Sequence, residues 1–372
     1  MKIPVWHPSI TEAEHTAVRR VLEIGYLGMG SDVFAFERLV AETLHVPEPT
    51  VVSAHTGQSA LHLALLAVGV GPGDLVITPS FNNVADFQAI QACGARPHFC
   101  DVDPVTGMMT LESLRRCPVA QAKCVITLDY ASQYCDLAAI AATCRAAKAK
   151  LIYDAAHTFG SPLDGRLDLA DATMFSFDPI KTLTAIDAGI IHSNSPEVID
   201  RIRKTRHMGM EQNLEALKQN KRSWNYDVKL PGYRYHLSNI HAAIGSVQIK
   251  RFPEIAQKRN ALARSFRQLT HSLGAHLDYL RLDEGFVPFM NCATVKNGRR
   301  DSLRTFLEEK GVQTGIHWTP GHHFSLFKDC PHDDLAGTEA FYASIISLPF
   351  YTDMTEEECR HVTGLISGFF RS

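Results

Sequence analysis

Short apolar segments alternate with segments of helical periodicity between residues 50 and 192, and this alternation restricts the fold more than any other feature. Apolar runs at 50–53, 75–78, 97–102, 124–128 and 151–153 are separated by stretches with apolar residues at helical spacing. Such a pattern predicts βαβ units, and therefore an α/β fold with a mainly parallel, doubly wound sheet. After about Phe252 the pattern changes to helix, strands and helix. We therefore predict a large domain at 1–251 and a smaller C-terminal α+β domain at 252–372.

The overall composition excludes several classes of partner. The chain has 372 residues and a formal net charge of -3, which gives no electrostatic reason to expect a nucleic acid or an anionic membrane as partner. No run approaches the roughly 18 apolar residues of a membrane span, and the first residues lack the apolar core of a signal peptide. A cytoplasmic protein is expected. Nine scattered cysteines without a CxxC pair predict neither structural disulfides nor structural zinc.

A single lysine, Lys181, lies in a predicted turn between two apolar strands, 173–177 and 188–192. If the turn is buried, the pKa of this lysine falls and its amine becomes a usable nucleophile. The alternative is an ordinary turn lysine. The sequence at this point leaves both interpretations open.

Asp154 follows the apolar run 151–153, where the carboxyl end of a parallel strand is expected. Ligands of open α/β sheets collect at these ends, and a buried carboxylate requires a partner. Enzymes that use pyridoxal 5'-phosphate (PLP) need a lysine for a Schiff base and an acid for the pyridine nitrogen. The alternative role for Asp154 is a helix N-cap.

The junction of residues 55–59 places Gly57 at a predicted helix start. Free N–H groups and the helix dipole there suit a phosphate group, although an ordinary capped helix explains the same residues. The glycine-rich turn at 25–30 includes Tyr26 and Gly28, which are candidates for substrate contact. His317, His322 and His323 lie in a predicted strand-to-loop region. We predict no metal site there, because no carboxylate or cysteine accompanies them at usable spacing.

Taken together, the motifs resemble the DegT/DnrJ/EryC1/StrS family of sugar aminotransferases, which are PLP enzymes of fold type I. The resemblance runs nearly end to end and in order, through IPVWHPSITEAE, GYLGMG, GQSALHLALLAVGVGPGDLVITPSF, DVDPVTG, IYDAAHTFGS, FSFDPIKTLT, PGYRYHLSNIHAAIGSVQIKR, TGIHWTP and SLPFYTDMTEEE. It implies an aspartate-aminotransferase-like large domain and a smaller C-terminal domain.

The resemblance also implies roles for individual residues. Lys181 would form the Schiff base and carry the proton, and Asp154 would pair with the pyridine nitrogen. His157 would lie near the ring hydroxyl. The phosphate would be held by Gly57, Gln58 and Ser176. His317, Tyr26 and Gly28 would contact the substrate.

At three places the chain departs from the family pattern. Gln58 stands where threonine or serine is common, and its amide still donates a hydrogen bond. Asn83 stands where an aromatic residue commonly stacks on the cofactor, so that either Phe81 or Phe87 would substitute or the stacking would be weaker. Arg234 and His236 stand in the segment with which the partner subunit reaches the phosphate. This segment implies a homodimer with shared active sites.

The implied activity is transfer of an amino group, with glutamate as donor, to the keto group of a nucleotide-linked deoxysugar. Pyridoxamine 5'-phosphate would be the intermediate form of the cofactor, and the product would enter polysaccharide or antibiotic sugar biosynthesis. One alternative is a PLP-dependent nucleotide-sugar dehydratase, but such relatives replace the lysine with histidine. Another is a noncatalytic regulatory relative, against which Lys181, Asp154, Ser176 and Gly57 argue together.

Overall fold

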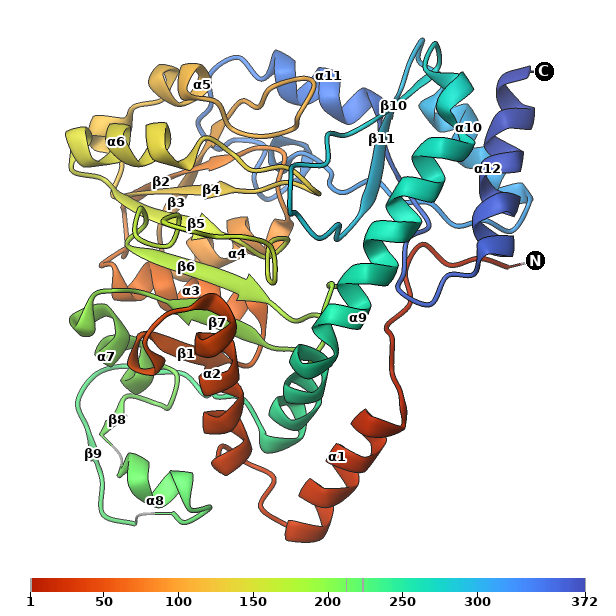
Figure 1. The fold of residues 1–372 in the computed structure, drawn as a ribbon. Helices are drawn as coiled ribbons and strands as arrows, with labels where there is room; N and C mark the ends of the chain where they lie inside the picture. The colour runs from red at the N-terminus through yellow and green to blue at the C-terminus, as the bar shows by residue number, and fades with distance from the viewer. Residues whose placement is uncertain (1, 212, 223, 372) are drawn as a thin grey trace.

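A seven-stranded sheet forms the centre of the larger part of the molecule in the computed structural model, which describes residues 2–211, 213–222 and 224–371 (Figure 1). Its strand order is β1-β7-β6-β5-β4-β2-β3. The strands are β1 (Val51–Ala54), β2 (Leu75–Pro79), β3 (Arg96–Cys100), β4 (Cys124–Leu128), β5 (Lys150–Asp154), β6 (Ala172–Ser176) and β7 (Gly189–His192). β7 runs antiparallel to both of its neighbours, β1 and β6, and the other neighbouring strands of this sheet pair in parallel. The predicted mainly parallel sheet is confirmed.

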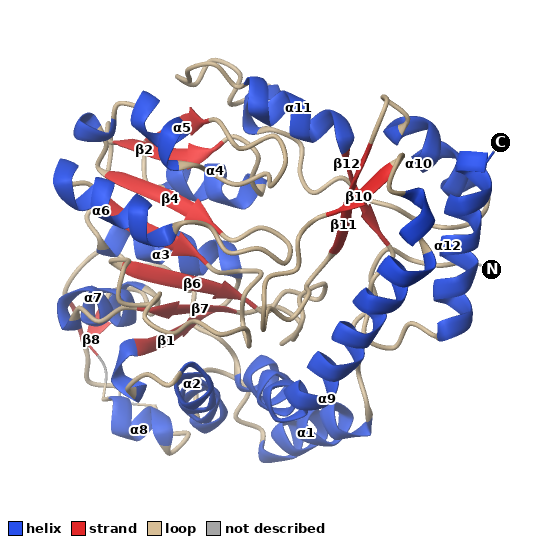
Figure 2. Ribbon diagram, turned by 45° about the horizontal axis from the view of Figure 1, so that its top comes forward, coloured by secondary structure: helices blue, strands red, loops and turns tan. Residues whose placement is uncertain are grey.

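Helices cover both faces of this sheet, as Figure 2 shows. On one face an apolar core joins the strands to α3 (Gly57–Ala67), α4 (Val84–Ala92) and α7 (Pro196–Thr205). On the other face a second core joins them to α2 (Ser31–Leu44), α5 (Leu111–Arg116), α6 (Leu137–Ala147) and α9 (Asn239–Leu269). Because both faces are covered, central strands such as β4 are buried along their whole length, which explains their continuous apolar sequences.

The C-terminal part contains a second, antiparallel sheet of β10 (Leu277–Tyr279), β11 (Asn291–Val295) and β12 (Ile345–Leu348). An apolar core packs this sheet against α10 (Arg300–Glu309), α12 (Glu356–Arg371) and the second half of α9. The predicted boundary at 251/252 lies inside α9, which runs for 31 residues past Pro253. The division into two domains stays a prediction.

The remaining α-helices of the described chain are α1 (Glu12–Ile24), α8 (Leu214–Lys218) and α11 (Ala336–Ser344), and its remaining strands are β8 (Met210–Glu211) and β9 (Asp227–Val228). Short 3-10 helices lie at Glu48–Thr50, Val119–Gln121, His271–Leu273 and Gly321–His323. None of the helices within the described ranges combines the length and the apolar character that a membrane span requires.

The first residues of the chain join the C-terminal part. The Ile3 N–H donates to the Gly311 carbonyl oxygen at 2.9 Å, and the Gln313 N–H donates to the Ile3 carbonyl oxygen at 2.9 Å. The two ends of the ribbon consequently lie on the same side of the molecule (Figure 1).

Candidate active site

A cavity of about 280 Å³ lies at the carboxyl ends of the central strands. This is the edge at which open α/β sheets bind ligands, and the volume is close to the lower end, about 300 Å³, of typical small-molecule sites. Predicted site residues that line it are Gly57, Gln58, Asn83, Asp154, His157, Ser176 and Lys181.

Lys181 lies in the turn between β6 and β7. The Asp178 side chain shapes this turn by accepting from the Ile180 N–H at 3.0 Å, and the Asp178 carbonyl accepts from the Lys181 N–H at 3.0 Å. The Lys181 Nζ lies 4.4 Å from the centroid of the Phe289 ring. Removal from water lowers the pKa of Lys181 to about 8, against the opposing charges of Asp154, Asp178 and Asp86. The amine therefore has the properties of a nucleophile rather than those of a solvated turn lysine.

Asp154 is the last residue of β5 and is buried. Its Oδ1 accepts from the Ala156 N–H at 2.9 Å, and residues 155–160 form turns rather than a helix, so the N-cap interpretation is wrong. Burial raises the pKa of Asp154 to about 6, while the hydrogen bond from Ala156 and the charge of Lys181 oppose the rise. A cation in the cavity would favour the ionised carboxylate.

The start of α3 forms one wall of the same cavity. Thr56 caps the helix by accepting from the Ser59 N–H at 2.9 Å, so the N–H groups of Gly57 and Gln58 belong to the first turn and have no acceptor within the helix. A Cβ atom on Gly57 would lie 2.9 Å from the Ser176 Oγ. Glycine therefore keeps open a concave surface of N–H groups and one hydroxyl, which suits a phosphate group.

Asp86 is a site residue that the sequence reasoning missed. It is buried on the first turn of α4, where its Oδ2 accepts from Asn82 Nδ2 at 2.8 Å, and it lines the cavity beside Asn83. Burial and the charge of Asp154 raise the pKa of Asp86 well above its usual value. Asp86 follows the N-cap Asn83 by three residues, so both lie on one face of the helix. This spacing was the sequence feature from which Asp86 could have been predicted as a site residue.

Comparison with known proteins agrees with this geometry. A family model described as the DegT/DnrJ/EryC1/StrS aminotransferase family matches residues 8–367. The chain belongs to this family.

Solved structures extend the likeness over the whole fold. The aminotransferase TlmJ from Streptoalloteichus hindustanus is 32% identical, with a TM-score of 0.91 over 100% of this chain and 99% of the other. NtdA from Bacillus subtilis, solved with bound cofactor PMP, is 25% identical, with a TM-score of 0.85 over 97% of this chain and 82% of the other. The sugar aminotransferase CalS13 from Micromonospora echinospora is 23% identical, with a TM-score of 0.85 over 98% and 99% of the two chains. The fold is PLP fold type I, and the family's cofactor is PLP.

The cavity fits this cofactor in its chemistry. Gly57, Gln58 and Ser176 present donors for a phosphate, and Asp154 and Lys181 present an acid and an amine within one enclosed space. His157 adds a polar imidazole ring to the wall of the cavity. Its Nδ1 accepts from the Ala131 N–H at 3.2 Å, and burial together with the charges of Lys181 and His317 lowers its pKa well below the usual value. His157 is therefore a neutral ring at neutral pH.

The predicted aromatic substitutes for Asn83 lie elsewhere. Phe81 packs against Tyr130 and Phe341, and Phe87 packs against Phe99 and Phe327, so neither lines the cavity. Both predictions are corrected for the same reason: each side chain is fully buried among other aromatic rings and does not reach the cavity.

Trp318 is the aromatic residue that does line the cavity, and the sequence reasoning missed it. Its ring stacks on the His157 ring with 5.2 Å between centroids and 21° between planes. It follows His317 in the TGIHWTP motif, but nothing in that motif indicates which of the two rings turns toward the cavity.

His317 lies beside the cavity rather than on its wall. It lines a neighbouring hollow with Ile180 and Phe289, and its Nδ1 lies 2.8 Å from the Ser347 Oγ. Burial and the charge of Lys181 lower the pKa of His317 to about 4. A role in substrate binding stays a prediction.

The remaining predicted residues form a second group. Tyr26, Gly28, Arg234 and His236 line a separate cavity of about 250 Å³ together with Trp224 and other residues. The segments 26–28 and 234–236 thus lie together, but in a single chain they line a different cavity from the one that contains Lys181.

The expectation that His322 and His323 lack a carboxylate partner is wrong. Glu339 Oε1 lies 2.7 Å from the Nε2 atom of each histidine. The carboxylate comes from α11, and helix packing rather than sequence spacing brings it to the pair.

Proposed function

We propose that this chain is a PLP-dependent sugar aminotransferase that transfers an amino group from glutamate to the keto group of a nucleotide-linked sugar. The observation that carries the proposal is the placement of Lys181 and Asp154 in one cavity, beside a phosphate-binding helix start. The fold that the chain shares with the sugar aminotransferase CalS13 agrees with a sugar substrate. PLP supplies an electron-withdrawing ring that stabilises negative charge at the substrate's reacting carbon.

The residues of the chain then have distinct tasks. Asp154, ionised beside a cation, holds the proton on the ring nitrogen. Lys181 would hold the cofactor through its amine and would move the proton at the reacting carbon, for which a pKa of about 8 is suitable. The N–H groups of Gly57 and Gln58 and the Ser176 hydroxyl bind the phosphate. His157 and Trp318 would form a stacked aromatic part of the cavity wall and help to exclude water.

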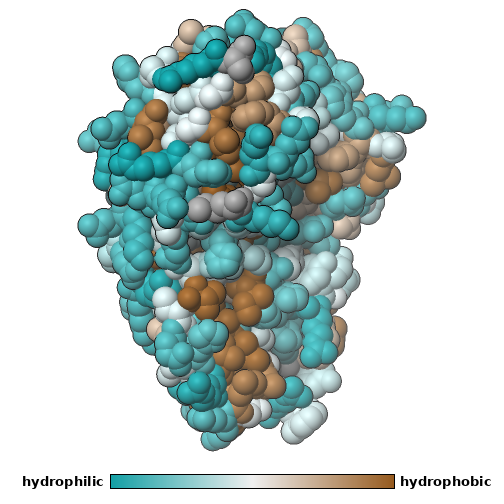
Figure 3. All heavy atoms as spheres, turned by 90° about the vertical axis from the view of Figure 1, so that its right-hand side faces the viewer, coloured by the Kyte–Doolittle hydropathy of each residue, from teal (hydrophilic) through white to brown (hydrophobic). Residues whose placement is uncertain are grey.

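The second cavity supports a homodimer. Within one chain the Tyr235 carbonyl oxygen accepts from the His55 N–H at 2.7 Å, which holds the 234–236 segment beside the end of β1, while Arg234 and His236 line the second cavity and not the one that contains Lys181. Exposed apolar side chains lie nearby, with Trp224 84% and Tyr226 46% exposed. Leu22 and Ile24 of α1 are also more than half exposed. Figure 3, which shows the right-hand side of the molecule in Figure 1, has a group of apolar residues in its lower half. In the proposed dimer, Arg234 and His236 of one subunit complete the phosphate site of the other.

The substrate is tested by mass spectrometry of products from a panel of nucleotide-linked keto sugars, each offered with glutamate and PLP. A matched panel of the same sugars without the nucleotide serves as control, and alanine and aspartate replace glutamate as control donors. The proposal expects the mass change of a keto group becoming an amine, only with the nucleotide-linked sugars and best with glutamate. Loss of water from the sugar, or no turnover with any member of the panel, would contradict it.

Shared sites are tested by mixing two inactive variants. Lys181→Ala lacks the amine, and Arg234→Ala lacks the proposed contribution across the interface. After subunit exchange in an equal mixture, about a quarter of the active sites contain both residues intact, so about a quarter of the activity should return. No recovery after demonstrated exchange would show that Arg234 acts within its own chain or not at all.

A further inference from the structure

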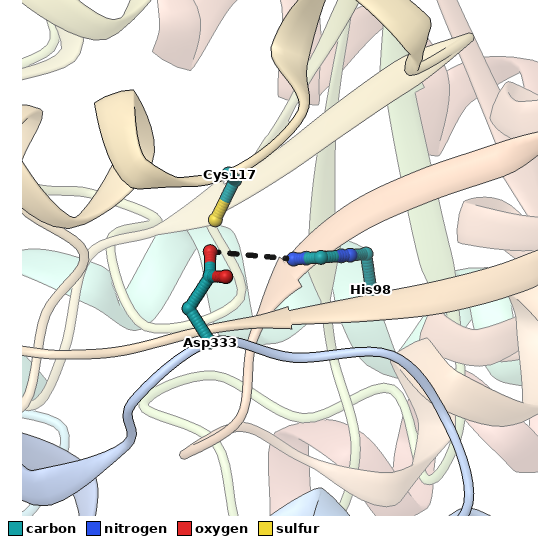
Figure 4. Close-up of side chains that lie close together, drawn as sticks. All are labelled: His98, Cys117 and Asp333. Carbon is teal, nitrogen blue, oxygen red and sulfur yellow. Dashed lines mark ion pairs between the residues drawn. The ribbon is translucent and has the colours of Figure 1, made fainter.

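Three potential metal ligands meet at the edge of the large sheet, away from the PLP cavity. His98 lies in the middle of the edge strand β3, Cys117 directly follows α5, and Asp333 lies in the loop before α11. Figure 4 shows the thiol, the imidazole and the carboxylate pointing toward one another. The nitrogen, sulfur and oxygen atoms that they offer all lie within 4.8 Å of one another.

The state of the His98 imidazole distinguishes this cluster from a chance grouping of polar side chains. Its side chain is only 8% exposed, and within the described part of the chain its Nε2 has no hydrogen-bond partner. The nearest carboxylate oxygen, Asp333 Oδ2, is 3.8 Å away, which is beyond hydrogen-bond distance. A buried ring nitrogen without a partner costs free energy, and it is aimed into the space between the sulfur and the carboxylate.

We propose that His98, Cys117 and Asp333 bind a divalent transition metal, Zn²⁺ in the first instance. A thiolate, an imidazole and a carboxylate are the three ligand types that Zn²⁺ accepts, and the thiolate disfavours Mg²⁺ and Ca²⁺. In a tetrahedral zinc site with bonds of about 2.0–2.3 Å, ligand atoms lie roughly 3.3–3.8 Å apart. Asp333, with a side chain 46% exposed, can close the remaining distance by a rotamer change, and water has access to the fourth position.

The metal would fasten the segment 327–335 to the sheet edge. That segment already lies along β3: the Phe99 N–H donates to the Pro331 carbonyl oxygen at 2.9 Å, and Arg96 Nη2 donates to the Asp329 carbonyl oxygen at 2.7 Å. The chain that leaves Trp318, on the wall of the PLP cavity, leads into this segment. Zinc at this position is therefore a structural tie between the sheet edge and the loop that completes the cavity.

The pair His322 and His323 with Glu339 is a different kind of cluster. The two Nε2 atoms share the Glu339 carboxylate as hydrogen-bond partner, and His322 Nδ1 lies 2.7 Å from the Ser80 Oγ. Both Nε2 atoms and the His322 Nδ1 thus already have hydrogen-bond partners, so this cluster serves as the internal control.

The test uses the full-length protein with PLP bound, stripped with EDTA and titrated with Co²⁺ as a spectroscopic substitute for Zn²⁺. The proposal expects the protein to bind one equivalent of Co²⁺ per chain. Binding should add thiolate-to-cobalt charge-transfer absorption to the spectrum of the PLP-bound protein, and one equivalent of Zn²⁺ should displace the Co²⁺. The midpoint of thermal unfolding should rise when Zn²⁺ is added, because the metal binds only the folded cluster.

Matched variants decide which residues bind. Cys117→Ser should abolish the charge-transfer absorption and lower the Zn²⁺ affinity at least about 100-fold, more than the loss of an outer-shell contact does. Asp333→Ala, at an exposed position that does not disturb packing, should lower the affinity as well. Cys330→Ser, Asp329→Ala and His323→Ala remove the same side-chain types outside the cluster and should change nothing. Absence of stoichiometric binding, or charge-transfer absorption that survives in Cys117→Ser or disappears in Cys330→Ser, would overturn the proposal.

Discussion

The pKa of Lys181 leads to a quantitative prediction about its reactivity. A fall from 10.5 to about 8 corresponds to a destabilisation of the charged amine by about 3 kcal/mol. At pH 7 about 9% of the amine is then uncharged, compared with about 0.03% for an ordinary lysine, a factor of about 300. The cofactor-free protein should therefore carry one lysine that reacts far faster than the others near neutral pH.

Competitive labelling measures this directly. Cofactor-free protein is treated with a trace acylating reagent across a pH series, with acetyl-lysine amide as internal control, and the peptide that contains Lys181 is quantified by mass spectrometry. Labelling should reach half its maximum near pH 8. Asp154→Asn should move this midpoint to lower pH, because the Asp154 carboxylate favours the charged ammonium. A midpoint at about 10 or above, or a shift to higher pH in Asp154→Asn, would refute the electrostatic reasoning.

Three further substitutions test other parts of the structure. Gly57→Ala places a Cβ atom 2.9 Å from the Ser176 Oγ. It should weaken PLP binding about 10-fold or more, which corresponds to about 1.4 kcal/mol, as measured by equilibrium dialysis. Unchanged affinity would show that the phosphate does not bind at this surface. Asp154→Asn should lower kcat about 100- to 1000-fold, by the scale of a lost charge-stabilising contact, while PLP stays bound; near-normal turnover would show the acid to be misassigned. Glu37→Ala leaves the buried Arg206 guanidinium without its carboxylate and should lower the free energy of unfolding by about 3–5 kcal/mol in denaturant titrations; a loss below about 1 kcal/mol would contradict this.

The parts of the site that the sequence predicted are those fixed by local structure. Strands buried on both faces have continuous apolar sequences, and the polar residues that end them must meet at one edge of a parallel sheet. Asp154 and Ser176 end β5 and β6, Lys181 lies in the turn after β6, and Gly57 begins the helix after β1. The strand pattern therefore predicts that Asp154, Ser176 and Lys181 lie near one edge of the sheet, whereas the role of Ser176 came from the family resemblance.

The parts that the sequence did not predict depend on packing between distant segments. Trp318 enters the cavity from a loop beyond β11, and Phe81 and Phe87 turn away because aromatic partners far along the chain surround them. Asp86 had a helical-face signal, but its burial depends on the neighbouring Asn82 and on the cavity itself. No local pattern specifies which of several rings faces a shared space.

The pairing of Ile3 with Gly311 and Gln313 has a consequence for how the protein is made. At roughly 5–20 residues per second, Ile3 is synthesised roughly 15–60 s before its hydrogen-bond partners. Throughout that interval the strand-like start of the chain has unpaired N–H and C=O groups. The strands of the large sheet, the last of which ends at His192, can therefore pair while the segment around Ile3 still lacks these partners.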